Sequence, residues 1–271
     1  MIRSAVTISL VAQARGGPFV FWDDLEKSCA AAADVGFAGV ELFLPDANAV
    51  EAPRLRRVLD STGLDLAAVG TGAGWVLHRL HLCDSDDRRR IAARDFIRGL
   101  IDFAGPFGAP VIIGSMQGPA TLDGSELKAR DWLRDALDDL ARHAQSYDTP
   151  VLLEPLNRYE TKLVNTLGAG VELVESLTID NVQLLGDFFH MNIEEHDLAA
   201  SLRATGTRLG HVHFVDSNRE AAGRGHLEFE PLRNALTDIG YDGYVSAEAR
   251  PLPDSMTAAK TTMATFQRLF R

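Results

Sequence analysis

The sequence predicts an α/β fold, a single (β/α)8 TIM barrel that spans residues 1–271. Short, apolar, β-rich runs alternate strictly with longer amphipathic segments, and there are eight such pairs. Strict alternation indicates a parallel sheet, and eight repeats in about 250 residues are typical of a closed barrel. No linker or low-complexity stretch divides the chain, so we expect one domain. A doubly wound open sheet is the structural alternative.

The first half of the chain contains four of the predicted strand–helix pairs. Glycines mark where two helices end, because Gly36 and Gly63 follow amphipathic runs. The glycine-rich stretch 71–82 is expected to be a flexible loop with Trp75 at its tip. The third helix is expected to bury one face, formed by Ile91, Ile97, Leu100, Ile101 and Ala104. The predicted strands are 5–10, 39–43, 66–70 and 110–114, and the predicted helices are 23–35, 53–61, 86–104 and 125–147.

The second half repeats the pattern with shorter helices. Its four predicted strands are the apolar runs 150–154, 182–187, 209–214 and 243–248. The helices that follow them are predicted at 168–177, 195–204, 231–239 and 255–270.

A metal-ligand residue type closes each of these last four strands: Glu154, Asp187, His213 and Glu248. One acid at the end of a strand is usually structural, as a helix cap or an arginine partner. Four in succession would meet on one rim of a barrel, the face where barrel active sites lie. Carboxylates with one imidazole suit a hard or borderline divalent cation that keeps open positions for a substrate.

Further polar residues follow the same strand ends. Glu160 lies six residues after Glu154, His190 three after Asp187, and Arg219 six after His213. They offer a carboxylate, an imidazole and a guanidinium that can reach a polar substrate above the metal. His211 points to the same face as His213, and we expect it to be hydrogen-bonded one layer deeper.

The two glutamates come from different strands and can approach a substrate from opposite faces. A cation that chelates a carbonyl and the neighbouring hydroxyl acidifies the carbinol C–H bond and stabilises the enediolate. If Glu154 removes this proton and Glu248 returns one on the other face, or the reverse, the centre is inverted. A one-base variant would be an aldose–ketose isomerase, and the residues alone leave both reactions open.

Composition restricts the partners. The net charge of −11 and the pI of about 5.2 disfavour nucleic acid, although a small phosphorylated substrate stays allowed. No apolar run is long enough to span a bilayer, so no membrane association is expected. Cys29 and Cys83 have no metal-site spacing and are expected to be reduced thiols. We expect no targeting signal and a cytoplasmic location.

Six motifs carry a family resemblance: GFAGVEL (36–42), EPLNRYET (154–161), DFFHMN (187–192), HVHFVDSNR (211–219), GRGHLEF (223–229) and SAE (246–248). In them the sequence resembles the sugar phosphate isomerase/epimerase superfamily of xylose-isomerase-like barrels. Within it, the sequence is most similar to the ketose 3-epimerases of the D-tagatose 3-epimerase type.

The resemblance implies roles for individual residues. Glu154, Asp187, His213 and Glu248 would be the metal ligands, and Glu154 and Glu248 also the catalytic acid–base pair. Glu160, His190 and Arg219 would bind the C1–C2 end of the sugar. The resemblance also implies manganese, with cobalt or magnesium as substitutes and zinc as a further candidate, and a homo-oligomer, dimer or tetramer.

The loops after the first, third and fourth strands depart from the ketose epimerases, so the sugar, free or phosphorylated, stays open. Three rivals remain. A hydroxypyruvate-isomerase-like enzyme, an inosose dehydratase or another keto-sugar lyase would use the same four ligands. A nuclease of the endonuclease IV type needs additional histidines and tolerates less negative charge. A catalytically inactive barrel that serves as a binding protein would have lost a ligand or base, and none is missing.

Overall fold

Eight parallel strands close into a barrel in the computed structural model, which describes residues 1–119 and 126–271. Closure occurs because β1 (Arg3–Ser9) pairs with β3 (Gly39–Phe43) on one side and with β9 (Tyr244–Ala247) on the other. The short β2 (Phe21–Trp22) adds to β1 outside this ring. The strands between β3 and β9 follow in chain order: β4 (Asp65–Gly70), β5 (Val111–Ile113), β6 (Val151–Leu153), β7 (Val182–Asp187) and β8 (Leu209–His213).

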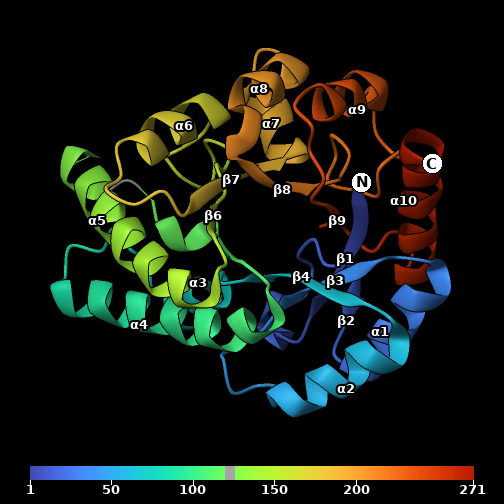
Figure 1. The fold of residues 1–271 in the computed structure, drawn as a ribbon, viewed down its shortest axis with the longest axis horizontal. Coiled ribbons are helices and arrows are strands. Elements are labelled where there is room, and N and C mark those ends of the chain that lie inside the picture. The colour runs from blue at the N-terminus through green and yellow to red at the C-terminus, as the bar shows by residue number, and fades with distance from the viewer. Residues whose placement is uncertain (120–125) are drawn as a thin grey trace.

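Helices surround this barrel, as Figure 1 shows. Most begin at an aspartate or threonine whose side chain accepts a backbone N–H, for example Asp24 and Asp254. Gly36 and Gly63 end the first two helices in the left-handed conformation. No described helix has both the length and the apolar character needed to cross a membrane. The α-helices are α1 (Leu25–Val35), α2 (Ala52–Thr62), α3 (Ala73–His78), α4 (Asp87–Ala104), α5 (Glu126–Ala144), α6 (Leu167–Glu175), α7 (Phe188–Glu194), α8 (Leu198–Thr205), α9 (Phe229–Asp238) and α10 (Ser255–Phe270).

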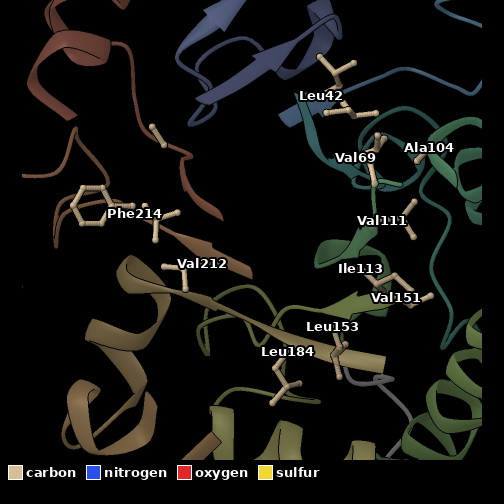
Figure 2. Packing of buried hydrophobic residues seen from close by; sticks show 14 of the residues in the cluster. Leu42, Val69, Ala104, Val111, Ile113, Val151, Leu153, Leu184, Val212 and Phe214 are labelled. Atoms are coloured by element: carbon tan, nitrogen blue, oxygen red, sulfur yellow. The ribbon is translucent and has the colours of Figure 1, made fainter. Parts of the chain in front are cut away.

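Alternate residues of each strand enter two different environments. Outward side chains such as Leu153, Leu184 and Val212 pack against the helices in one large apolar cluster, part of which Figure 2 shows. Inward residues form a smaller apolar layer, Ala68, Ile112, Leu152 and Leu185. Because side chains alternate with a period of two, the next inward position of β7, beyond Leu185, is Asp187 at the rim. The apolar layer is thus the floor on which the polar rim is built.

The predicted closed barrel is confirmed, and all eight predicted strands are present within a few residues of the predicted bounds. Two stretches taken as loops are helical: α3 replaces part of the loop at 71–82, and α7 follows β7 directly. Both are about two turns long, too short for a clear amphipathic period. The prediction for Ile91 was wrong, since its side chain is exposed. It lies about a third of a turn from the buried stripe of α4 that includes Ile97 and Ile101. The predicted start of the fourth helix, at 125, lies outside the described residues.

Candidate metal centre

Four side chains meet at the carboxyl-terminal rim of the barrel: Glu154, Asp187, His213 and Glu248. One ligand atom from each lies within 4.8 Å of the corresponding atoms of the other three. Strand register explains part of this, because Asp187 and His213 are directly paired between β7 and β8. Glu154 follows β6 and Glu248 follows β9. Since β6 to β9 are consecutive neighbours, the four residues form an arc with the two glutamates at its ends.

Asp187 divides its two carboxylate oxygens between the fold and the centre. Oδ1 caps α7 by accepting the backbone N–H groups of Phe189 at 2.7 Å and His190 at 3.0 Å. Oδ2 lies 3.1 Å from Nδ1 of His213. The cap therefore fixes the direction in which the second oxygen points.

His213 turns its two ring nitrogens to opposite sides. Nδ1 is 3.1 Å from Asp187 Oδ2, 3.4 Å from Glu154 Oε1 and 3.6 Å from Glu248 Oε2. Nε2 is 3.3 Å from Oε1 of Glu41, which comes from β3 across the barrel. One nitrogen thus faces three carboxylates, and the other faces a fourth.

Glu41 also contacts the second histidine of β8. Its Oε2 is 3.0 Å from Nε2 of His211, which is buried one layer below His213, as expected. Burial alone would raise the pKa of Glu41, but the charge of His213 and the hydrogen bond from His211 lower it below its ordinary range. Glu41, His211 and His213 form a second group with metal-ligand spacing. It supplies only one carboxylate, already bonded to His211, so we favour the four-residue group as the metal centre.

The four-residue group crowds three carboxyl groups and one imidazole together. Oε1 of Glu154 is buried and has no hydrogen-bond partner among the described residues. Burial raises the pKa of the Glu248 carboxyl to about 8, against the opposing charges of His213 and Arg219. For His213, burial lowers the pKa, but Glu41 and Glu248 outweigh it and raise the pKa well above its usual value. Carboxylate oxygens, one of them buried without a hydrogen-bond partner, together with one imidazole fit a divalent cation.

Arg219 joins the rim to the predicted substrate-binding residues. Its Nη2 donates to Glu248 Oε2 at 2.8 Å, and its Nη1 donates to Glu160 Oε1 at 3.4 Å. The guanidinium also lies 4.9 Å from the ring centroid of Phe189 on α7. Arg219 has a φ of +62°, a conformation that an arginine adopts only when its surroundings enforce it.

Asp216 is the residue that holds this turn. Its buried carboxylate accepts the backbone N–H groups of Ser217 at 2.8 Å, Gly223 at 2.9 Å and Leu227 at 3.1 Å. The N–H of Arg219 donates to the Asp216 carbonyl at 2.9 Å. Asp216 thereby ties both ends of the loop together and orients the Arg219 side chain.

His190 is buried on α7, behind the rim. Its Nδ1 accepts the N–H of Asn157 at 3.2 Å and lies 2.8 Å from the Asn157 amide nitrogen, so we assign its proton to Nε2. This Nε2 is 3.9 Å from Glu154 Oε1. Asn157 also donates to Glu160 at 3.2 Å. The structure thus places Glu160, His190 and Arg219 around the four predicted ligands.

A cavity of about 550 Å³ opens above the centre, within the range of roughly 300–1,000 Å³ usual for small-molecule sites. Asp187 and His190 do not line it; they are buried beneath its wall. Its polar lining comprises, among others, Glu41, Glu154, Glu160, His213, Arg219 and Glu248.

Sequence reasoning missed three residues of this assembly: Glu41, Asn157 and Asp216. Glu41 left one signal, a carboxylate in the middle of the apolar strand GVELF, where burial requires a partner. Asp216 follows the strand that ends at His213 and precedes a glycine-rich turn, a usual place for a loop-bonding aspartate. Asn157 gave no signal beyond its place in the EPLNRYET motif.

Comparison with known proteins agrees with this geometry. The sequence profile of a family described as xylose isomerase-like TIM barrel matches residues 29–269. The 3-dehydro-D-guloside 4-epimerase of Escherichia coli is 32% identical over 233 residues, which are 80% of this chain and 84% of that protein. The L-ribulose 3-epimerase of Mesorhizobium japonicum is 30% identical over 233 residues, 83% of this chain and 75% of that one. The crystal structure of a 3-keto-D-glucoside 4-epimerase from E. coli superimposes with a TM-score of 0.82, 26% identity and coverage of 98% and 99%.

Proposed function

We propose that this protein inverts a carbinol carbon next to a ketone with the help of a divalent cation. The chain belongs to the xylose isomerase-like TIM barrel family and is a sugar epimerase like its named relatives. One observation carries the proposal. Glu154 and Glu248 stand at the two ends of the arc of predicted ligands and line one cavity.

The chemistry requires two groups that exchange a proton with the same carbon from opposite faces. In our proposal, Glu154 and Glu248 are this pair: one removes the proton beside the ketone, and the other delivers a proton to the opposite face. Arg219 holds Glu248 by one nitrogen and Glu160 by another, so it keeps the carboxylate in place. Glu154 is buried, whereas Glu248 and Arg219 are partly buried and Glu160 is exposed.

Glu154, Asp187, His213 and Glu248 would hold the cation. When bound, it would stabilise the negative charge that develops on the ketone oxygen. We propose manganese, with cobalt, magnesium or zinc as substitutes, because the donor set combines hard oxygens with one imidazole.

The charges in the cavity favour a neutral sugar over a sugar phosphate. Among the described residues that line the cavity, each arginine is already paired: Arg219 with Glu248 and Glu160, and Arg15 with Asp23. A phosphate would need a cation of its own, because transfer of an unpaired anion into a largely buried site is costly.

The relatives support two positions for the inverted centre. Their names specify a ketose inverted at C3 and a 3-keto glycoside inverted at C4, and in both the centre adjoins a ketone. Aldose–ketose isomerisation or dehydration at the same centre is the alternative reaction. A dimeric or tetrameric assembly and a cytoplasmic location stay predictions.

The test is proton exchange with solvent in D2O. The manganese-loaded protein would be offered free ketoses, ketose phosphates and 3-keto glycosides, and deuterium uptake would be followed by NMR. We expect deuterium at the carbon next to the ketone with an inverted product, and loss of turnover in Glu154→Gln and in Glu248→Gln. Deuterium at C1 or C2 with an aldose product would show an isomerase, and expulsion of water would show a dehydratase.

A further inference from the structure

The cavity is larger than one sugar ring requires. A hexose has about twelve non-hydrogen atoms, and twelve separate water molecules, at about 30 Å³ each, would fill only about 360 Å³. Covalently bonded atoms pack more closely than separate waters. A cavity of about 550 Å³ therefore leaves room for a second group beside a sugar at the metal centre.

The wall opposite the carboxylates is aromatic. Phe19, Phe43 and Trp75 line the cavity from the segments around β2, β3 and β4, whereas the predicted ligands come from β6 to β9. The rings of Phe19 and Phe43 are stacked with centroids 4.5 Å apart. Trp22 closes the stack edge-on to Phe19 at 5.4 Å. Figure 1 shows β3 and β4 on the other side of the barrel from β7 and β8.

Glycines keep the floor between the two sides open. A methyl group on Gly114 would clash with Glu154 Oε2, and one on Gly72 would lie 2.9 Å from the Ser115 hydroxyl and 3.1 Å from the Phe43 ring. Gly72 and Gly114 thus leave space between the carboxylate of Glu154 and the ring of Phe43.

The aromatic wall offers little to a hydroxyl group. Phe19, Phe43 and Val76 have no side-chain hydrogen-bonding atoms, Trp75 offers a single indole N–H, and Arg15 beyond them is paired with Asp23. A sugar end with a hydroxyl on every carbon would lose hydrogen bonds to water there, whereas an apolar or planar group would gain by desolvation.

We propose that these residues form an outer compartment that binds an apolar or planar substituent on the sugar, so that the substrate class is a keto glycoside with such an aglycone. The outer compartment is defined by Phe19, Phe43, Trp75 and Val76. The inference rests on the proposed function for the chemistry at the metal centre. The aglycone takes no part in the reaction: the carbon next to the ketone loses one proton and regains one, and the glycosidic bond stays intact.

The test compares two substrates that differ only in the aglycone, methyl and 4-nitrophenyl 3-keto-β-D-glucopyranoside. The ratio of their kcat/KM values would be measured by deuterium exchange in the wild type and in Trp75→Ala. We expect the wild type to prefer the aryl glycoside by about tenfold to a hundredfold, in line with desolvation of one apolar group. Trp75→Ala is expected to lose at least about tenfold of this preference, and Trp75→Phe to retain part of it.

Trp132 provides the matched control. It is partly buried like Trp75, and each of the two rings has an arginine over it, Arg90 for Trp132 and Arg79 for Trp75, but Trp132 does not line the cavity. Trp132→Ala should keep the wild-type ratio. An equal kcat/KM for both glycosides in the wild type, or the same ratio in Trp75→Ala as in the wild type, would overturn the inference and leave the proposed function standing.

A binding measurement separates the two proposals. The unreactive methyl and 4-nitrophenyl β-D-glucopyranosides lack the ketone, so calorimetry measures their binding without the reaction, and the difference between the two reports on the outer compartment. Absence of exchange with every keto sugar would overturn the proposed function. In that case, tighter binding of the aryl glycoside to the wild type and to Trp132→Ala than to Trp75→Ala would still support the outer compartment. Equal affinity of all three proteins for the aryl glycoside would overturn it.

Discussion

Glu41 lies on the side of His213 that points away from the other carboxylates. Its Oε1 lies 3.3 Å from Nε2 of His213, while Nδ1 of the same ring lies 3.1 Å from Asp187. A carboxylate on the second nitrogen fixes the tautomer and the orientation of a metal-binding imidazole and makes it a stronger ligand. In our proposal Glu41 is a positioning residue, 172 residues before the histidine that it orients.

Glu41→Gln removes this charge and keeps the side-chain size. We expect the affinity for Mn²⁺ to fall by about 10- to 100-fold, the range seen when such a partner of a metal ligand is replaced. Calorimetric titration of the metal-free protein measures it. Glu230→Gln, at an exposed glutamate paired with Arg268, is the matched control and should bind Mn²⁺ like the wild type. Unchanged affinity in Glu41→Gln would refute the positioning role.

Bound metal should stabilise the fold. A ligand at 100 times its Kd adds about 2.7 kcal/mol to the free energy of unfolding. For a protein of this size we expect Tm to rise by roughly 5–10 °C on addition of Mn²⁺ and to fall back with a chelator. The double variant Glu154→Gln/Glu248→Gln should lose the increase. If this variant keeps the increase, the metal binds elsewhere, and the group around Glu41 and His211 becomes the candidate.

Gly114→Ala tests the space beside Glu154. Its methyl group would fall 2.3 Å from Oε2 of Glu154, which is the far end of a flexible side chain and would move away. We expect lower Mn²⁺ affinity and lower kcat/KM. Gly168→Ala is the control, because a methyl group there meets nothing within 4 Å and lies in α6. It should keep activity and add up to about 1 kcal/mol of stability. Wild-type metal binding in Gly114→Ala would contradict the close approach.

Arg219→Lys keeps the positive charge but removes the guanidinium group, whose two terminal nitrogens donate to Glu248 and Glu160 at the same time (the Arg219 fork). Loss of one charge-assisted hydrogen bond should lower kcat/KM by roughly tenfold or more. Arg224→Lys is the control in the same loop, since its side chain is exposed and, within the described part of the chain, pairs with Glu220 alone. Steady-state kinetics with the substrate identified by exchange would measure both. Equal losses in the two variants would argue against a specific role of the Arg219 fork.

Asp216→Asn should change the pH dependence of stability. Burial opposes the ionised form, but the N–H groups of Gly225, Leu227, Ser217 and Gly223 lower the pKa of Asp216 below its ordinary value of 3.8. A lowered pKa in the folded state stabilises the protein above pH 3.8, and this contribution is lost as the pH falls through the lower, folded-state pKa. The free energy of unfolding of the wild type should therefore exceed that of the variant by about 1–3 kcal/mol at pH 5–7. This difference should become smaller below pH 3.8. Denaturation at several pH values measures it, and a difference that grows toward acid would contradict this sign.

The strand pattern alone was enough to predict the barrel. Short apolar runs between amphipathic segments identify the strands, and parallel strands of one barrel end on one rim. The proximity of Asp187 and His213 follows from this, because they are the last residues of neighbouring strands. The same reasoning placed His211 one layer deeper, where it is hydrogen-bonded to Glu41.

The short helices escaped prediction. α3 and α7 are each about two turns long, and the α7 stretch FFHMNIE has no polar face of its own. Asp187 caps the start of α7 with one carboxylate oxygen. In the sequence, its place at the end of a strand indicated a metal ligand, and its role as a helix cap was not predicted. A helix this short is stabilised by its cap and by packing rather than by its own sequence.

By itself, the sequence determined the fold, the rim and the four residues expected to bind the metal, since each depends on periodicities within a single strand or helix. Only the tertiary structure decided the partner of His213, the fork of Arg219 between Glu160 and Glu248, and the aromatic wall opposite the carboxylates. These contacts join residues that are far apart in the chain or enter the site from opposite sides of the barrel. Their distances are fixed by the closure of β1 onto β9 and by the register of every strand between, which no local pattern encodes.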